Sequence, residues 1–104
     1  LLKARKLKIA IVFTYETFSF EVWLSGVNRK AQAVDWQMIK DAGWNQYTLS
    51  PNPKKEDYIA RSILAADPDF GDLDALTDRI RVGTLVFIQN VEAFLSINIL
   101  TNSR

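Results

Sequence analysis

The stretch that decides the fold is LKIAIVFTYETFSFEVWL, which spans residues 7–24. Residues 7–15 are mostly β-branched and aromatic, and residues 18–24 place an apolar side chain at every second position. Both patterns are typical of β-strands. We therefore expect an antiparallel hairpin with Glu16 and Thr17 at its tip, or with a longer loop there, because Glu-Thr is a poor two-residue turn.

The spacing also predicts how the two strands pair. With the tip at residues 16–17, four apolar pairs fall opposite one another: Tyr15 and Phe18, Phe13 and Phe20, Ile11 and Val22, and Ile9 and Leu24. All these side chains share one face, and a shift by one residue would turn them toward water, so the register should be firm. The opposite face is mixed and carries Ala10, Val12, Thr14, Ser19, Glu21 and Trp23.

A helix over residues 29–42 is expected after the hairpin. Asn28 is a good N-cap, and Gly43 stands where a glycine commonly ends a helix. We expect the apolar side of this helix to pack on the sheet. That side consists of Val27, Ala31, Val34, Met38 and Ala42, widened by Trp36 and Ile39.

The second half of the chain predicts a short strand at residues 47–49 and two more helices. Asn52 and Pro53 are start signals for a helix over residues 54–66, with an apolar face of Tyr58, Ile59, Ile63 and Leu64. The last helix is marked by the recurrence of Leu73, Leu76, Ile80, Phe87, Val91 and Phe94, and Asp72 or Asp74 can cap it. Gly83 inside this helix indicates close packing there.

The expected fold class is α+β, with a small antiparallel sheet covered by three helices in a single domain over residues 1–104. The sheet consists of the N-terminal β-hairpin and the short third strand. Two or three strands are few for a sheet, and the first strand would leave an open apolar edge. We expect a second copy of the chain, or a further N-terminal segment missing from it, to pair with that strand.

Composition excludes several kinds of chemistry. The 104 residues include no His and no Cys, which excludes His-based triads, thiolate nucleophiles, Cys/His zinc sites and disulfides. Thirteen Lys and Arg against twelve Asp and Glu leave a net charge of +1, so no global attraction to nucleic acid is expected. No stretch approaches the roughly 18 apolar residues of a membrane helix, and no signal-peptide pattern is present, which predicts a cytoplasmic protein without a membrane partner.

Two blocks resemble a family of uncharacterised bacterial proteins, a domain of unknown function. The first block is KLKIAIVF at residues 6–13 with FEVWLSGVNRK at residues 20–30, and the second is DPDFGDLDALT at residues 67–77, continuing through residues 83–85 to residues 91–95. The resemblance implies an α+β fold, a bacterial and cytoplasmic setting, no known reaction, and an additional N-terminal helix and strand. The chain departs from the family pattern at residues 31–35, which are less charged, and at Ala66, where Asn is expected.

The junction of the second strand and the first helix is the main candidate ligand site, with Gly26, Asn28, Arg29 and Lys30. Free N–H groups at a helix N-terminus bind anions, and Arg29 and Lys30 would otherwise oppose the helix dipole. A phosphate-like anion is the natural ligand, although no full phosphate-loop motif is present. The alternative is a structural ion pair between Arg29 and Glu21 or another acidic side chain.

Glu21 and Trp23 are the second candidate pair. A partly buried carboxylate beside an indole can act as an acid or a base. Strand nucleases with an E-x-K motif would need Lys at the position of Trp23, which argues against that activity. The alternative is a structural pair between Glu21 and an Arg or Lys, and no residue is assigned a catalytic role.

Two charged stretches are better explained without a ligand. The acidic residues Asp67, Asp69, Asp72, Asp74 and Asp78 do not fit a calcium loop, whose sixth position is Gly and whose twelfth is Glu, so helix capping and a solvated turn are expected. The basic residues near the N-terminus are expected to be a solubilising flank and not a nucleic-acid site. Neither a metal nor a cofactor is expected.

The function expected from these observations is a non-catalytic interaction or scaffold domain. The thin sheet, its open first strand and the lack of a catalytic constellation support that expectation. The alternative is a binder of an anionic ligand, or an enzyme acting on one, at the helix N-terminus between Gly26 and Arg29. The ligand would be a phosphate-containing small molecule or a nucleic acid.

Overall fold

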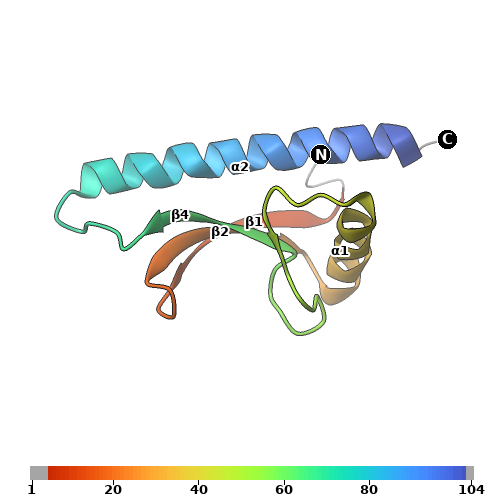
Figure 1. Ribbon diagram of the computed structural model, residues 1–104, viewed down its shortest axis with the longest axis horizontal. Coiled ribbons are helices and arrows are strands. Elements are labelled where there is room, and N and C mark those ends of the chain that lie inside the picture. Colours follow the sequence, from red (N-terminus) through yellow and green to blue (C-terminus); the bar gives the residue numbers. More distant parts are fainter. Residues whose placement is uncertain (1–4, 103–104) are drawn as a thin grey trace.

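The computed structural model describes the backbone of residues 5–102 and the side chains of residues 5–97 (Figure 1). The elements in chain order are β1 (Leu7–Thr14), β2 (Ser19–Gly26), α1 (Arg29–Ala42), β3 (Thr48–Leu49), β4 (Ala60–Ala66) and α2 (Leu73–Asn102). The fold class is α+β.

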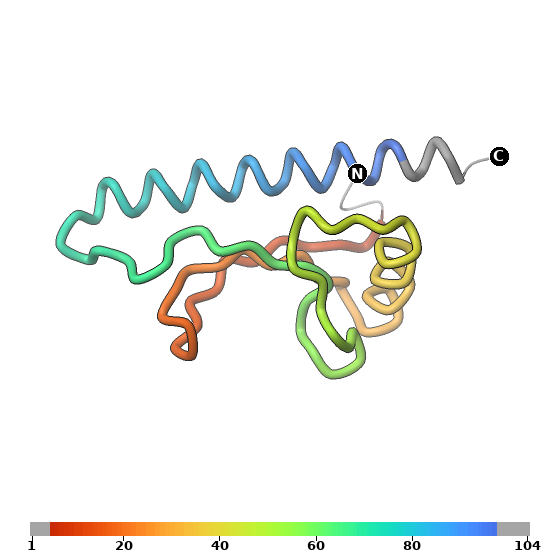
Figure 2. The backbone as a smooth tube through the Cα atoms, in the orientation of Figure 1, coloured from red at the N-terminus to blue at the C-terminus, as the bar shows by residue number. Residues whose placement is uncertain are grey.

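The four strands form one antiparallel sheet in the order β1-β2-β4-β3. Helix α2 runs along one face of this sheet, and α1 lies at one end of it (Figure 1). The core between α2 and the sheet contains Leu7, Val22, Leu24, Ile59, Ala60, Leu64, Phe87, Val91 and Leu95. Within residues 5–102 no helix covers the opposite face, from which the hairpin loop and the β3–β4 loop extend away from α2 (Figure 2).

The hairpin and its register are confirmed. Phe13 lies opposite Phe20, Ile11 opposite Val22, and Ile9 opposite Leu24. Val22 and Leu24 are fully buried, whereas Ile11 at the sheet edge is 51% exposed. The loop is the longer alternative: residues 15–18 connect the strands, so Tyr15 and Phe18 lie outside them, and Phe18 takes a left-handed φ of 47°.

The prediction of three helices is wrong, because the structure has two helices and four strands. Residues 54–66 are not helical: residues 50–59 are mostly loop, and residues 60–66 form β4 between β2 and β3. Ile59 and Ile63 sit four residues apart, which imitates a helical face, but both are β-branched and favour extended backbone. The decisive factor is tertiary, because β2 has a free second edge that β4 satisfies with its own backbone groups.

The close packing predicted at Gly83 is confirmed. The β2–β4 register shifts at Phe20 and Glu21, where Phe20 faces Ala65 and Glu21 faces Ile63, so Leu64 is the extra residue of a bulge. Leu64 reaches α2, and a Cβ built on Gly83 would lie 2.8 Å from Leu64 Cδ2. A glycine at this position lets α2 approach β4.

The ends of α1 are confirmed, and its predicted packing side is confirmed in part, because Ile39 is in the core and Trp36 and Met38 pack against it. The Asn28 Oδ1 accepts the Ala31 N–H at 2.8 Å, and Gly43 ends the helix at a φ of 74°. Val34, at the centre of the predicted packing face, is 61% exposed. The buried residues of α1 are Gln32, Asp35 and Ile39. Polar groups can face inward here because each finds partners, as described below.

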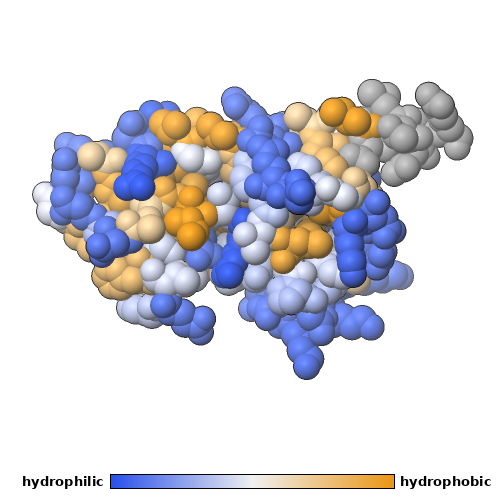
Figure 3. All heavy atoms as spheres, viewed as in Figure 1, coloured by the Kyte–Doolittle hydropathy of each residue, from blue (hydrophilic) through white to orange (hydrophobic). Residues whose placement is uncertain are grey.

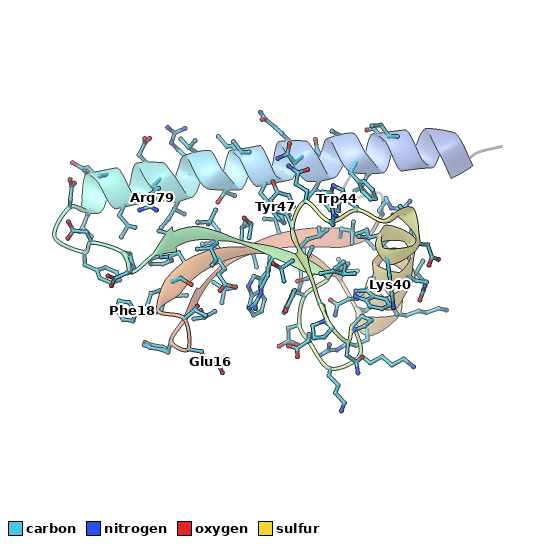
Figure 4. All side chains as sticks on the ribbon, in the orientation of Figure 1. Glu16, Phe18, Lys40, Trp44, Tyr47 and Arg79 are labelled. Carbon is cyan, nitrogen blue, oxygen red and sulfur yellow. The ribbon has the colours of Figure 1, made fainter. Side chains whose placement is uncertain are left out.

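Helix α2 is the longest element, and the segment after α1 packs against it. Asp72 caps it by accepting the Ala75 N–H at 3.2 Å. Figure 4 labels Trp44 and Tyr47 beneath the helix, where Trp44 stacks on Phe94 with ring centroids 4.4 Å apart. The Asn90 amide donates to the Tyr47 hydroxyl at 2.7 Å. These contacts join the C-terminal half of α2 to the loop between α1 and β3.

One observation corrects the membrane argument from sequence. The Leu73–Ile97 segment of α2 is long and apolar enough to cross a membrane by length and composition, although an 18-residue apolar stretch was not expected. Its inner side forms the core with Phe87, Val91 and Leu95. Its outer side exposes further apolar residues, namely Val82, Leu85, Val86 and Ile97.

Candidate functional site

A groove of about 700 Å³ lies on the sheet face opposite α2. Its walls are the hairpin loop on one side and the β3–β4 loop on the other, and Figure 3 shows a hollow between these two lobes. The floor residues are Trp23, Tyr58 and Arg61. The wall residues are Thr14, Tyr15, Glu16 and Thr17 on the hairpin side, and Thr48, Leu49, Pro51 and Glu56 on the other. The predicted candidate Trp23 therefore lies in the floor of this groove.

Glu21 lies beneath this floor, where it is 1% exposed. Its Oε1 accepts the Trp23 indole N–H at 3.0 Å and lies 3.3 Å from the Arg61 Nη1. Its Oε2 accepts hydrogen bonds from the hydroxyls of Thr14, Thr17 and Ser19 at 3.3–3.5 Å. Because a buried carboxylate is tolerated only when it is paired and hydrogen-bonded, this network explains the polar residues on the mixed face of the hairpin.

The floor combines two aromatic rings with one cation. The rings of Trp23 and Tyr58 are 5.1 Å apart and tilted by 43°. The Arg61 guanidinium lies 5.1 Å from the Tyr58 ring centroid, within cation–π range. Residues from β2 and β4 thus meet because Trp23 and Arg61 are cross-strand partners. Tyr58 is only 5% exposed, so Trp23 supplies the ring surface that a ligand can contact.

The remaining charges of the groove are negative. Glu16 is on the hairpin loop, whose tip Figure 4 labels, and Glu56 is on the opposite wall. Among residues 5–97, neither carboxylate forms an ion pair. Arg61 is the lone basic residue of the lining, and it is already paired with Glu21. The groove is therefore acidic in a chain whose overall charge is +1.

The other predicted candidates lie apart from the groove, at the start of α1. Gly26 is needed for contact with α1, because a Cβ there would lie 2.5 Å from the Gln32 backbone nitrogen. The Gln32 side chain accepts the Gly26 N–H at 3.2 Å and donates to the carbonyls of Pro53 and Glu56 at 2.9 and 2.8 Å. The glycine and the helix start thus hold the β3–β4 loop in place.

Arg29 forms the structural ion pair that was the alternative to a ligand site, with Asp57 as the acidic partner. Its guanidinium donates to Asp57 Oδ1 at 2.7 Å and also to the carbonyl of Glu56. Glu21, the other partner considered for Arg29, pairs with Arg61. Arg29 therefore fastens the wall of the groove without entering it.

Lys30 faces a second, separate hollow of about 380 Å³. Arg5, Lys6 and Asn28 also line it, as does Asp35, which is buried and paired with Arg5. Three cations and one carboxylate thus surround the N-terminal turn of α1.

The acidic run at the start of α2 serves local structure. The Asp69 carboxylate accepts the Gly71 N–H at 2.8 Å, and Asp78 pairs with Arg81 at 2.6 Å. Among the residues that the structure describes, no group of three or more acidic side chains could hold a metal ion. A turn contact accounts for Asp69, helix capping for Asp72, and an ion pair along the helix for Asp78.

The family of the chain is shown by comparison with family models. The model of a domain of unknown function, DUF7000, matches residues 1–95. The chain belongs to this family. The match agrees with the resemblance of the two sequence blocks to an uncharacterised family. Neither the curated proteins nor the solved structures hold a match to the chain.

Three groove residues of this DUF7000 domain could not be placed from its sequence: Tyr58, Arg61 and Glu56. All three follow Pro53, in the segment interpreted as a helix, which would have put Arg61 out of register with Trp23. Assignment of β4 as a strand would have revealed Arg61, because Trp23 and Arg61 would then fall on the mixed face beside Glu21.

Proposed function

We propose that this DUF7000 protein is a non-catalytic interaction domain that associates with a second copy of itself through the free edge of β1. Its resemblance to bacterial proteins supports a bacterial, cytoplasmic setting. The single observation that carries the proposal is the position of β1, which pairs with β2 on one side and with no strand among residues 5–102 on the other.

The edge of β1 is suited to strand addition. The Val27 N–H donates to the Lys6 carbonyl, so in this antiparallel ladder the alternate residues Leu7, Ile9, Ile11 and Phe13 direct their backbone groups away from β2. Strand β1 has eight residues, no proline and one charge, Lys8. Proteins usually protect such edges with charges, prolines or bulges, and an apolar edge without them pairs readily with another strand.

The chemistry of the groove supports a role without catalysis. The candidate acid or base, Glu21, is buried under the floor with every contact directed to the protein itself. A general base must come within hydrogen-bond reach of a substrate proton, whereas Glu21 is 1% exposed and is not part of the groove lining.

Light scattering on the purified chain tests the proposal. We expect twice the mass of the 11.9 kDa chain, and a monomer for Ile11→Pro. Proline at this outward position removes no bond to β2, so the fold should persist by circular dichroism. The control Val86→Glu changes the outer side of α2 and should remain a dimer. A monomeric wild type, or a dimer lost in Val86→Glu and kept in Ile11→Pro, overturns the proposal.

A second candidate function is anion binding at the hollow lined by Arg5, Lys6 and Lys30. Arg5 is paired with Asp35, and the remaining cations Lys6 and Lys30 beside a helix N-terminus favour a phosphate group. Titration with inorganic phosphate, followed by the amide signals of residues 28–31, should show binding that Lys30→Ala weakens severalfold. Lys54→Ala, on the β3–β4 loop, is the control and should leave binding unchanged. Equal affinities for the two variants would remove this candidate.

A further inference from the structure

We propose that the groove over Trp23 and Tyr58 receives the basic side chain of an arginine or lysine residue in a partner polypeptide. This site is separate from the β1 edge, so it requires no second copy of the chain. The proposal depends on three features of the groove, namely its charge, its aromatic floor and its size.

The charge of the groove favours a cation. Glu16 and Glu56 occupy opposite walls, and neither forms an ion pair among residues 5–97. Arg61 in the floor is matched by the buried Glu21 at 3.3 Å, so its charge is compensated within the protein. Two carboxylates without an ion pair among residues 5–97 therefore remain on the walls. They would repel an anionic ligand and attract an ammonium or guanidinium group.

The floor supplies a surface for that cation. Trp23 is partly exposed, and its indole N–H is bound to Glu21, which holds the ring in one orientation. Tryptophan is the best aromatic partner for a cation. Exposed threonine hydroxyls on both walls can accept hydrogen bonds from the N–H groups of the bound cation. The protein already uses this chemistry internally, because the Arg61 guanidinium lies over the Tyr58 ring while paired with a carboxylate.

The size of the groove indicates a side chain carried by a peptide. A volume of about 700 Å³ lies within the range of drug-sized ligand sites. It exceeds what a free amine would fill, and the open side of the groove, between two loops, leaves room for flanking backbone. A folded partner would therefore present one basic side chain to the floor and its main chain to the walls.

The indole N–H signals of the three tryptophans provide a site-specific test. Nitrogen-edited NMR spectra would follow a titration with N-acetylarginine amide, and with the neutral isostere N-acetylcitrulline amide as the matched probe. We expect the Trp23 signal to shift saturably in the millimolar range with the arginine probe and not with citrulline. The signals of Trp36, which is bonded to the Ser50 carbonyl, and of Trp44, which stacks on Phe94, should stay in place.

Charge variants complete the test. Glu16→Gln and Glu56→Gln should each weaken binding of the arginine probe about threefold, the double variant more, and Glu92→Gln on α2 should have no effect. Binding should persist in Ile11→Pro, which separates this proposal from strand pairing at β1. The proposal is overturned by equal shifts with arginine and citrulline, by unchanged affinity in the double variant, or by a preference for N-acetylaspartate amide.

Discussion

Arg61 of β4 reaches across to Glu21 of β2, and its Nη1 lies 3.3 Å from the carboxylate Oε1. The Glu21 side chain is 2% exposed, whereas that of Arg61 is 36% exposed. Because an unpaired buried charge is costly, this contact ties the position of β4 to β2 and builds the groove floor at the same time. The residues that stabilise the sheet are thus the same residues that shape the candidate site.

The Glu21 network can be tested by Glu21→Gln. We expect the free energy of unfolding to fall by about 1–3 kcal/mol, because the amide removes the charge that Arg61 faces and replaces one acceptor oxygen with a donor. Urea denaturation measures the loss. The exposed Glu92→Gln serves as the control, with an expected change below about 0.5 kcal/mol. Equal stabilities of the two variants would contradict a structural role for Glu21.

Gly26 precedes α1 and Gly43 follows it, and substitution of each by alanine should lower the stability of the protein by a different amount. Gly26→Ala places a methyl 2.5 Å from a backbone nitrogen of Gln32, which cannot move without shifting the helix, so a loss of about 2–3 kcal/mol is expected. Gly43→Ala meets no atom within 4 Å and costs only the left-handed backbone, about 1 kcal/mol. Thermal unfolding of both variants measures this order, and the reverse order would refute the close approach of Gly26 to α1.

The β3–β4 loop should depend on Gln32 more than on Arg29. Gln32 is 3% exposed and bonds three backbone groups, so Gln32→Ala should cost about 2–3 kcal/mol. The Arg29 and Asp57 side chains are 54% and 76% exposed, and solvent screening limits the effect of Arg29→Ala to below about 1 kcal/mol. Hydrogen exchange over residues 50–58 should quicken clearly in Gln32→Ala alone. Comparable exchange in both variants would show that the loop is held in another way.

Substitutions at Gly83 should separate helix propensity from packing. Gly83→Ala brings its methyl against the flexible end of Leu64, a contact that a small rotation relieves, and alanine adds about 1 kcal/mol of helix propensity. The net change in stability should be near zero. Gly83→Leu cannot be accommodated in this way and should cost about 1–3 kcal/mol. Chemical denaturation distinguishes these outcomes, and a stabilising Gly83→Leu would show that α2 and β4 are not in close contact.

The candidate site was predictable where the pattern was local. Glu21 and Trp23 alternate with Phe20 and Val22, so their shared position on the face opposite the core follows from strand geometry alone. Arg61 was not predictable, because its neighbours repeat at spacings that suit a helix as well as a strand. Its position beside Glu21 depends on pairing between β2 and β4, across 40 residues of chain.

The buried side of α1 shows a similar limit. Apolar periodicity correctly selected Ile39, Trp36 and Met38, which pack in or against the core, but it also selected Val34, which is 61% exposed. The inner face contains Gln32 and Asp35, whose burial depends on partners from distant segments, Pro53 and Glu56 for Gln32 and Arg5 for Asp35. Sequence periodicity measures hydrophobicity along one helix and contains no information about such partners.

By itself, the sequence determined the hairpin and its register, both ends of α1 and the close approach at Gly83. These features depend on side-chain period, helix caps and the properties of glycine, all of which act within a few residues. Only the tertiary structure decided that residues 60–66 are a strand, that Gln32 and Asp35 of α1 face inward beside Ile39, and that Arg61 meets Glu21 beneath a groove. The physical reason is that an unpaired strand edge and a buried charge each require a partner, and the chain supplies both from segments distant in sequence.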